Sequence, residues 1–274
     1  MTDAGNIPAT RYERIVRLWQ QKQIATDAEL SEALNAHSIA FVYHSGKIEN
    51  EHVTYHDTRE IFERDIVTAY TGDLRTLFEI RGAKNAYELF LTAFGASRSL
   101  DENLIQELQG CLVRNTYDER SGEYKRNDYR AGRNAVGVLP EDVPEEMQKL
   151  LGGLQELENR DALTAAAYFH AKFENIHPFA DGNGRIGRLA MNYFLVLHSH
   201  PPVIIHEEDR QEYDRALEVW DTALDLLPIH DFLRWQTEKT WEKQMQRIEK
   251  RNSCPGQGEK CLGRKKLRSF LVVC

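Results

Sequence analysis

Residues 177–188, His-Pro-Phe-Ala-Asp-Gly-Asn-Gly-Arg-Ile-Gly-Arg, bring together side chains that could act on a phosphate. His177 can accept a proton near neutral pH. Asp181 offers an oxygen ligand of the kind that holds Mg²⁺ beside bound phosphates. Arg185 and Arg188 carry guanidinium groups, which fork onto phosphate oxygens. A base, a metal ligand and two cations in one stretch predict attack of a hydroxyl on a nucleotide phosphate.

The glycines of this stretch predict an anion site. Gly182 and Gly184 flank Asn183, just before a segment that is strongly helical from about residue 185 through 197. Glycine tolerates positive φ and leaves the backbone N–H groups uncovered, so that successive N–H groups form a nest for anions. The positive end of the helix dipole points at the same spot. We therefore expect phosphate to bind at the start of this helix.

The predicted helix has two faces. Arg185, Arg188 and Asn192 fall on one side at about 100° per residue, and we expect this side to contact the nucleotide. The other side should face the core, because it is apolar: Ile186, Leu189, Ala190, Tyr193, Phe194 and Leu197.

Two other interpretations of the same residues are weaker. Gly182-x-Gly184-x-x-Gly187 also spells a dinucleotide-binding fingerprint, but that motif needs a buried strand before it. Residues 165–174 have a helical pattern instead. A capped helix with a surface histidine is the plainer alternative. It leaves unexplained why an Asp, an Asn and two Arg converge on one end.

The elements that must position these residues are mostly helical. Hydrophobic periodicity and caps predict helices at about 10–23, 27–43, 57 or 58 to 70, 84–94, 101–114, 144–157, 162–173, 185–197, 207–226 and 229–249. Turn signals and strand-like residues make 121–140 the one credible hairpin. Trp220, Leu224, Phe232, Trp235 and Trp241 are candidates for the core of the last two helices. The sequence predicts a single all-α domain with a small β-hairpin.

A second short pattern lies near the N-terminus. Ser45, Glu49 and Asn50 fit (Ser/Thr)-x-x-x-Glu-(Gly/Asn), and on a helix Ser45 and Glu49 would be neighbours. Asn50 can take the left-handed conformation that ends a helix. Alone, this pattern is also compatible with a solvated helix end.

Composition limits the class of protein. The 274 residues carry a net charge of −8, which argues against a general nucleic-acid binder. We see no apolar run of membrane-spanning length and no secretion signal, and four cysteines without framework spacing fit a reducing cytoplasm. His44, His52 and His56 do not match a structural zinc pattern. Residues 250–274, with seven basic residues and one acidic, predict an unstructured tail.

Residues 177–188 resemble the signature of the Fic family, His-x-Phe-x-(Asp/Glu)-Gly-Asn-Gly-Arg-x-x-Arg, and match it at every fixed position. The resemblance implies a helical Fic fold and transfer of AMP from ATP to a hydroxyl of a target protein. His177 would deprotonate the Ser, Thr or Tyr of the target, and Phe179 would anchor the loop. Asp181 would bind Mg²⁺ on the α- and β-phosphates. The phosphates would lie against Gly182, Asn183, Gly184 and Arg185, with Arg188 on the γ-phosphate.

The N-terminal pattern resembles the inhibitory motif of Fic proteins that carry their inhibitor before the core. The resemblance implies that Glu49 pairs with Arg188 and keeps it from the γ-phosphate. The hairpin at 121–140 falls where the family has its flap, which holds a target segment by main-chain pairing. We therefore expect N-terminal helices with the inhibitory segment in 1–57, a catalytic core in 58–249 and the tail in 250–274.

The activity predicted from these resemblances is AMP transfer, inhibited by Glu49. Its partners would be ATP and a protein with an exposed hydroxyl, and modification of the chain by itself stays open. Alternatives are another Fic transfer, such as UMP or phosphocholine, removal of AMP, and a nucleotide-binding regulator without transfer activity. An intact His177 favours an enzyme.

Overall fold

The computed structural model describes residues 9–114, 116, 121–128, 130–131, 134–135, 137–157 and 161–253. Its elements are α1 (Arg11–Gln20), α2 (Asp27–Ala33), α3 (Asn35–Glu49), α4 (Tyr55–Arg64), α5 (Leu74–Gly95), α6 (Glu102–Val113), β1 (Arg130–Ala131), β2 (Asn134–Ala135), η1 (Pro140–Asp142), α7 (Val143–Leu157), α8 (Ala162–Ile176), α9 (Asn183–Leu197), η2 (Glu207–Asp209), α10 (Arg210–Ala223) and α11 (Leu227–Ser253).

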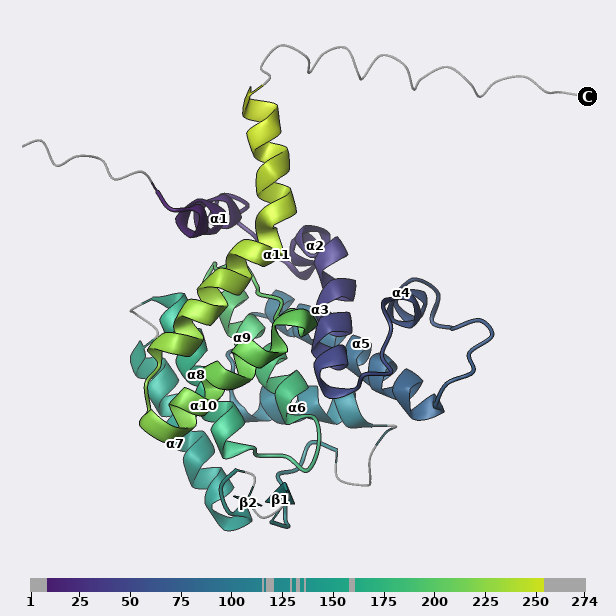
Figure 1. Cartoon of the computed structure of the whole chain (residues 1–274), viewed down its shortest axis with the longest axis vertical. Helices are drawn as coiled ribbons and strands as arrows, with labels where there is room; N and C mark the ends of the chain where they lie inside the picture. The colour runs from purple at the N-terminus through teal and green to yellow at the C-terminus, as the bar shows by residue number, and fades with distance from the viewer. Residues whose placement is uncertain are drawn as a thin grey trace, which may run out of the picture.

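The helices surround α9, which lies in the middle of the body (Figure 1). α9 packs against α3, α5, α6 and α8, and almost all of its side chains are buried. β1 and β2 form a short antiparallel pair, with Arg130 opposite Ala135 and Ala131 opposite Asn134. The all-α prediction with a small hairpin is confirmed for the described part of the chain.

Capping residues explain where several helices begin. The side chain of Thr10 accepts a hydrogen bond from the backbone of Glu13 at the start of α1. Thr26 and Glu29 form the same reciprocal capping box at the start of α2. Each box satisfies two backbone donors that the helix leaves unpaired. The predicted starts at residues 10 and 27 are therefore close to the observed ones.

The prediction of one helix over 27–43 was wrong. Leu34 leaves helical geometry, with φ −105° and ψ 7°, and separates α2 from α3. Leu34 is only 1 % exposed and belongs to the core. Because of the break, α3 starts in a new direction and runs through the Ser45–Glu49 pattern to Glu49.

Three further expectations need correction. α4 begins earlier than predicted, at Tyr55, because Thr54 caps it. Leu224 ends α10 in the left-handed conformation and is 73 % exposed, and Trp235 is 45 % exposed, so neither belongs to the core. α11 continues to Ser253, and the rest of the predicted tail lies outside the described residues.

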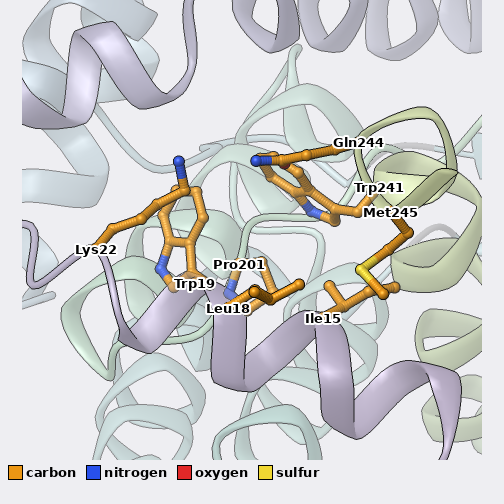
Figure 2. Close-up of a pocket in the computed structure, with 8 residues that line it drawn as sticks. All are labelled: Ile15, Leu18, Trp19, Lys22, Pro201, Trp241, Gln244 and Met245. Atoms are coloured by element: carbon orange, nitrogen blue, oxygen red, sulfur yellow. The ribbon is translucent and has the colours of Figure 1, made fainter. Parts of the chain in front are cut away.

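A small apolar pocket lies between α1 and α11, and Figure 2 shows Trp19 and Trp241 on opposite sides of it. The centroids of these two rings are 5.2 Å apart. None of the predicted site residues lines this pocket. Its apolar walls dock α1 onto the second half of α11.

None of the helices in the described part of the chain combines the length and the apolar character that a membrane span requires.

Candidate active site

His177 lies where α8 ends. Asp161 caps the start of this helix, and His177 ends it in the left-handed conformation, with φ 52° and ψ 62°. The His177 N–H still donates to the carbonyl of Phe173 at 3.0 Å. Two residues later, Phe179 is fully buried, as expected for an anchor. The chain therefore reverses sharply at the histidine and is fixed on both sides of it.

The surroundings of His177 keep its ring neutral. Burial lowers the pKa of His177 below its ordinary value, and the positive charge of Lys125 lowers it further. The backbone of Glu174 provides a hydrogen bond to the ring. One nitrogen is thereby oriented, and the other stays available to accept a proton. A neutral, oriented imidazole is the form that a general base requires.

The turn after His177 is held by Asn183. The backbone N–H of Phe179 donates to Asn183 Oδ1 at 2.8 Å, and Asn183 Nδ2 donates to the Phe179 carbonyl at 2.8 Å. Gly182 precedes the helix in the left-handed region, with φ 84°, which a side chain would strain. The Asn183 side chain thus shapes the loop, and its backbone N–H belongs to the start of α9.

The start of α9 is an uncapped helix end. No side chain caps it, and its first turn contains Asn183, Gly184 and Arg185. The first N–H groups of a helix have no partner within the helix, and they carry the positive end of the dipole. Such a helix start favours an anion, and the phosphate site that the glycine pattern predicts at this point stays a prediction.

Asp181 fits the role of a metal ligand. Its Oδ1 accepts from the Gly182 N–H at 2.8 Å and from Arg185 Nη2 at 3.2 Å. Its Oδ2 is buried and has no hydrogen-bond partner among the described residues. Mg²⁺ is commonly held by one or two carboxylates together with substrate phosphates. The described residues contain no cluster of three or more His, Cys, Asp or Glu that would hold a metal by itself.

Arg188 is 1 % exposed and is paired with the N-terminal pattern. Its Nε donates to Ser45 Oγ at 2.9 Å, and its Nη2 donates to the Ser45 carbonyl at 2.9 Å. Nη2 also forms an ion pair with Glu49 Oε1 at 2.7 Å. The structure therefore brings Ser45, Glu49 and Arg188 together across more than a hundred residues of sequence.

Glu49 lies directly against the helix start. A Cβ added to Gly184 would collide with the Glu49 carboxylate and would lie 3.0 Å from Arg188 Nη1. Burial opposes ionisation of Glu49, but the charge and hydrogen bond of Arg188, together with other nearby arginines, outweigh burial and hold its pKa below the ordinary value. Arg188 has a pKa above its ordinary value, since the negative groups around it, Glu49 first among them, together offset the burial that would lower it. An ionised carboxylate thus occupies the place that suits an anion.

Asn50 does not end α3 in the left-handed conformation that the sequence suggested. Its backbone is extended, with φ −136° and ψ 108°. Its side chain donates to Thr76 Oγ1 at 3.2 Å and to Glu79 Oε2 at 2.7 Å. Asn50 does not contact Arg188 in these bonds. It ties the end of α3 to α5.

Asn192 was expected beside the nucleotide, and the structure places its amide elsewhere. Asn192 Nδ2 donates to the Val203 carbonyl at 2.9 Å, and Oδ1 accepts from the Val203 N–H at 2.7 Å. Both ends of the amide are therefore used to fix the extended segment after α9. We assign Asn192 to positioning this segment.

Two side chains near the site were not predicted. Gln109, on the otherwise apolar inner face of α6, donates to the Asp181 carbonyl at 3.2 Å and accepts from the Gly122 N–H at 2.6 Å. Lys125 is 3 % exposed, and its positive charge acts on His177. A buried glutamine among leucines was the only signal that the sequence offered, because both contacts join distant segments.

The segment that contains β1 and β2 is fixed on both sides of His177. The Lys125 N–H donates to the Pro178 carbonyl at 2.9 Å, and the Val138 N–H donates to the Ile176 carbonyl at 3.1 Å. Gly137 has φ 76°, and a Cβ there would collide with the Ile176 carbonyl and His177. The predicted hairpin thus reaches the histidine through main-chain bonds. Tyr129 and Val136, which were expected in it, lie outside the described residues.

Comparison with known proteins identifies the family. The model of the Fic/DOC family matches residues 99–195, which include the whole of residues 177–188. "Protein adenylyltransferase Fic" of Drosophila persimilis is 32 % identical over 202 residues, or 73 % of this chain. The chain belongs to the Fic/DOC family. The protein of that name from Drosophila erecta is 31 % identical over 218 residues, or 78 % of the chain. This Fic/DOC chain spans only 39 % and 43 % of the lengths of these two relatives.

Solved structures share the Fic fold. A Fic domain containing signaling protein from Bacteroides thetaiotaomicron has a TM-score of 0.73 and 25 % identity. The match covers 84 % of this chain and 94 % of that one. A structure of Fic-1 from C. elegans has a TM-score of 0.71 at 24 % identity, with 87 % of this chain and 73 % of that one covered.

Proposed function

We propose that this Fic/DOC protein is a protein adenylyltransferase, which moves AMP from ATP to a Ser, Thr or Tyr hydroxyl of a target protein. The observation that carries the proposal is the position of the Glu49 carboxylate: it lies over the uncapped start of α9 and pairs with Arg188. A built anion site beside a neutral histidine supports chemistry on a phosphate. The relatives named protein adenylyltransferase Fic support the choice of AMP as the group transferred.

In the proposed reaction, His177 takes the proton of the target hydroxyl. The hydroxyl oxygen attacks the α-phosphorus of ATP, the bond to the β-phosphate breaks, and pyrophosphate leaves. The backbone N–H groups at the start of α9 hold phosphate oxygens, and Arg185 and Arg188 add positive charge. Asp181 is the residue that would hold Mg²⁺, which neutralises charge on the phosphates when it is bound.

We further propose that the chain inhibits itself. As long as Glu49 occupies Arg188, the guanidinium cannot bind the γ-phosphate, and ATP cannot take a productive position. Ser45 supports this state, because it accepts from Arg188 through both its hydroxyl and its carbonyl. On this proposal residues 1–57 carry the inhibitory segment, 58–249 form the catalytic core and 250–274 form an appended tail. The segment around β1 and β2 would hold the target by main-chain pairing. The partners of the protein would be ATP and the target protein.

The test is transfer from labelled ATP to proteins of a cell lysate, read on a gel. Wild type should transfer little, Glu49→Gly should transfer at least tenfold more, and His177→Ala should transfer none. Glu51→Ala, a substitution of an exposed neighbour, is the matched control and should behave as wild type. If Glu49→Gly transfers neither AMP nor another nucleotide to any protein, the proposed activity is wrong.

Removal of AMP is a second candidate, favoured by one observation. The Glu49 side chain is 38 % exposed although it lies beside the phosphate site, so it can contact water there. A carboxylate in this position could orient water to attack the phosphorus of an AMP-modified side chain, which breaks the P–O bond to that side chain and releases AMP. Wild type added to purified AMP-modified target distinguishes the two activities. Release of AMP that is lost in Glu49→Gly supports removal, and no release leaves inhibition as the only role of Glu49.

A further inference from the structure

The carboxyl group of Glu174 lies close to the first turns of α9. It has no role in the proposed reaction. Glu174 is in the last turn of α8, and its side chain reaches under α9. A Cβ added to Gly187 would lie 2.6 Å from Glu174 Oε1, so the glycine leaves the space that this carboxyl fills. Oε1 is buried and has no hydrogen-bond partner among the described residues. Natural proteins rarely leave a buried polar atom unpaired without a reason.

The charged and titratable groups around Glu174 come from four helices. On α8, His170 Nδ1 lies 3.9 Å from Oε1. From α9, Arg188 provides a positive charge, and from α3 and α10 Glu49, Asp221 and Asp214 provide negative charge. Tyr213 of α10 faces Arg188 and shares a 2.7 Å hydrogen bond with His170 Nε2.

His170 and Glu174, the buried titratable groups of α8 in this cluster, are mainly uncharged at neutral pH. Burial and the charge of Arg188 lower the pKa of His170 to about 3, so its ring carries no proton-borne charge at neutral pH. Burial raises the pKa of Glu174 to about 8, and the opposing charge of Arg188 does not cancel this effect. When Glu174 is protonated, Glu49 is the one ionised partner in direct contact with Arg188 within the described part of the chain. An ionised Glu174 would be a second negative charge that acts on Arg188.

We propose that Glu174 is a positioning residue for the phosphate site, and that its carboxyl must carry a proton for Arg188 to accept a polyphosphate. The inference rests on the proposed function, since the polyphosphate is that of ATP. A protonated Glu174 leaves the positive charge of Arg188 directed at the helix start. Loss of the proton draws that charge toward α8 and adds repulsion for the incoming phosphates. ATP binding is therefore linked to the protonation of Glu174.

The sign of the linkage follows from the states involved. Phosphates bring more negative charge to Arg188 than Glu49 does, so bound ATP favours the protonated form of Glu174 still more. ATP binding then takes up a proton when the pH is above the value at which Glu174 of the free protein ionises. The dissociation constant of ATP should rise up to tenfold per pH unit there, and it should be flat at lower pH.

The experiment measures ATP binding by calorimetry with Mg²⁺ in the Glu49→Gly variant, which lacks the carboxylate that competes with ATP for Arg188. Glu49 is one of the charges that raise the pKa of Glu174, so this variant ionises at a somewhat lower pH than wild type. Between pH 7.5 and pH 9 the dissociation constant should therefore rise by roughly eightfold or more, as expected for one proton. Adding Glu174→Gln, which imitates the protonated carboxyl, should reduce the rise to less than threefold. Adding Asp214→Asn instead is the matched control, because this acid also acts on Glu174 but is exposed, and the rise should persist.

A second measurement does not depend on ATP. Glu174 has a folded-state pKa above its unfolded value of 4.5, so its stabilising contribution is complete below 4.5 and is lost as the pH rises toward about 8. Glu174→Gln should therefore raise the melting temperature relative to wild type by at least about 3 °C at pH 8.5, and by much less at pH 5. A gain that is equal at both pH values would mean that Glu174 is not protonated in the folded protein.

The outcomes separate the inference from the function on which it rests. An equal rise in the dissociation constant with and without Glu174→Gln assigns the proton to another group and overturns the inference. A flat dissociation constant in Glu49→Gly also overturns it, while the nucleotide site stands. No ATP binding at any pH, with the chain folded, removes the nucleotide site itself and with it the proposed function.

Discussion

The loop 177–188 and the segment 45–50 meet at Arg188, but they are built in opposite ways. The loop is fixed from within: the Asn183 amide bonds Phe179 twice, and Phe179 is fully buried. The segment 45–50 is fixed to the loop through Arg188, and its Glu49 side chain is 38 % exposed. The loop can keep its shape when the Glu49 carboxylate moves, whereas the segment 45–50 is held from outside, by Arg188 and by the bonds from Asn50 to α5. A preformed site with a removable occupant is the arrangement that reversible inhibition requires.

The largest effect should come from His177, the proposed general base in the loop. In the Glu49→Gly background, His177→Ala should lower transfer by about 10²–10⁴-fold, the usual contribution of a general base. ATP affinity should stay within threefold, because the start of α9 and Arg188 remain. The measurement is initial rates of labelled AMP transfer beside calorimetric binding. Transfer within threefold of the parent would show that another group accepts the proton.

The next effect concerns the metal. Asp181→Ala should remove the Mg²⁺ dependence of ATP binding, because no cluster of His, Cys, Asp or Glu among the described residues can replace its buried Oδ2. ATP titrations over a range of Mg²⁺ concentrations measure this directly. Asp128→Ala, in an exposed position, should leave the dependence unchanged. The same dependence in Asp181→Ala and wild type would exclude Asp181 as the ligand.

The third prediction breaks the contact between the two regions from each side. A charge-assisted hydrogen bond such as that between Glu49 and Arg188 contributes about 1.5–3 kcal/mol, so its loss should shift the population by roughly ten- to a hundredfold. Glu49→Gly should activate transfer by at least tenfold. Arg188→Ala breaks the same contact but removes a phosphate ligand, so it should not activate.

The double variant sharpens this asymmetry. It should behave as Arg188→Ala does, because no ligand for the γ-phosphate remains. Lower activity in all three variants would indicate general destabilisation rather than a latch. Rates and melting temperatures measured on the same preparations distinguish these cases.

The smallest effect concerns Asn50, which holds the inhibitory segment against α5. Asn50 ties the end of α3 to Thr76 and Glu79 of α5, so Asn50→Ala should loosen the segment without removing its contact with Arg188. Neither of these two bonds contacts Arg188, so only part of their free energy acts on the ion pair, and we expect transfer to rise by about two- to fivefold. Transfer assays beside the Glu51→Ala control measure it. An increase as large as that of Glu49→Gly would mean that anchoring to α5, rather than the ion pair, sets the inhibition.

The sequence predicted the parts of this site that are contiguous. Residues 177–188 contain the proposed base, the proposed metal ligand and the glycine turn within one loop, so their proximity needs no knowledge of the fold. The pairing of Glu49 with Arg188 followed from a family resemblance, and spacing within the sequence would not have predicted it. Most helices were predicted because caps and hydrophobic periodicity are local signals.

The contacts that the sequence did not predict join distant segments. Gln109 reaches Asp181, 72 residues later in the chain, and Lys125 and Glu174 take their electrostatic roles from burial. Burial depends on how all the helices pack, and no short window contains that information. For Asn192 the helical face was predicted, but the bonds to Val203 were not, because Val203 lies beyond the end of the helix.

The two main-chain bonds beside His177 have a consequence for how such proteins acquire new targets. Backbone groups bond without regard to side-chain identity, so the bonds from Lys125 to Pro178 and from Val138 to Ile176 should tolerate sequence change between the anchors as long as Gly137 is kept. We therefore expect that the stretch between residues 125 and 138 can be replaced by the corresponding stretch of a related protein. Grafting the corresponding stretch of another Fic protein between these anchors should redirect which proteins are modified and leave the histidine where it is.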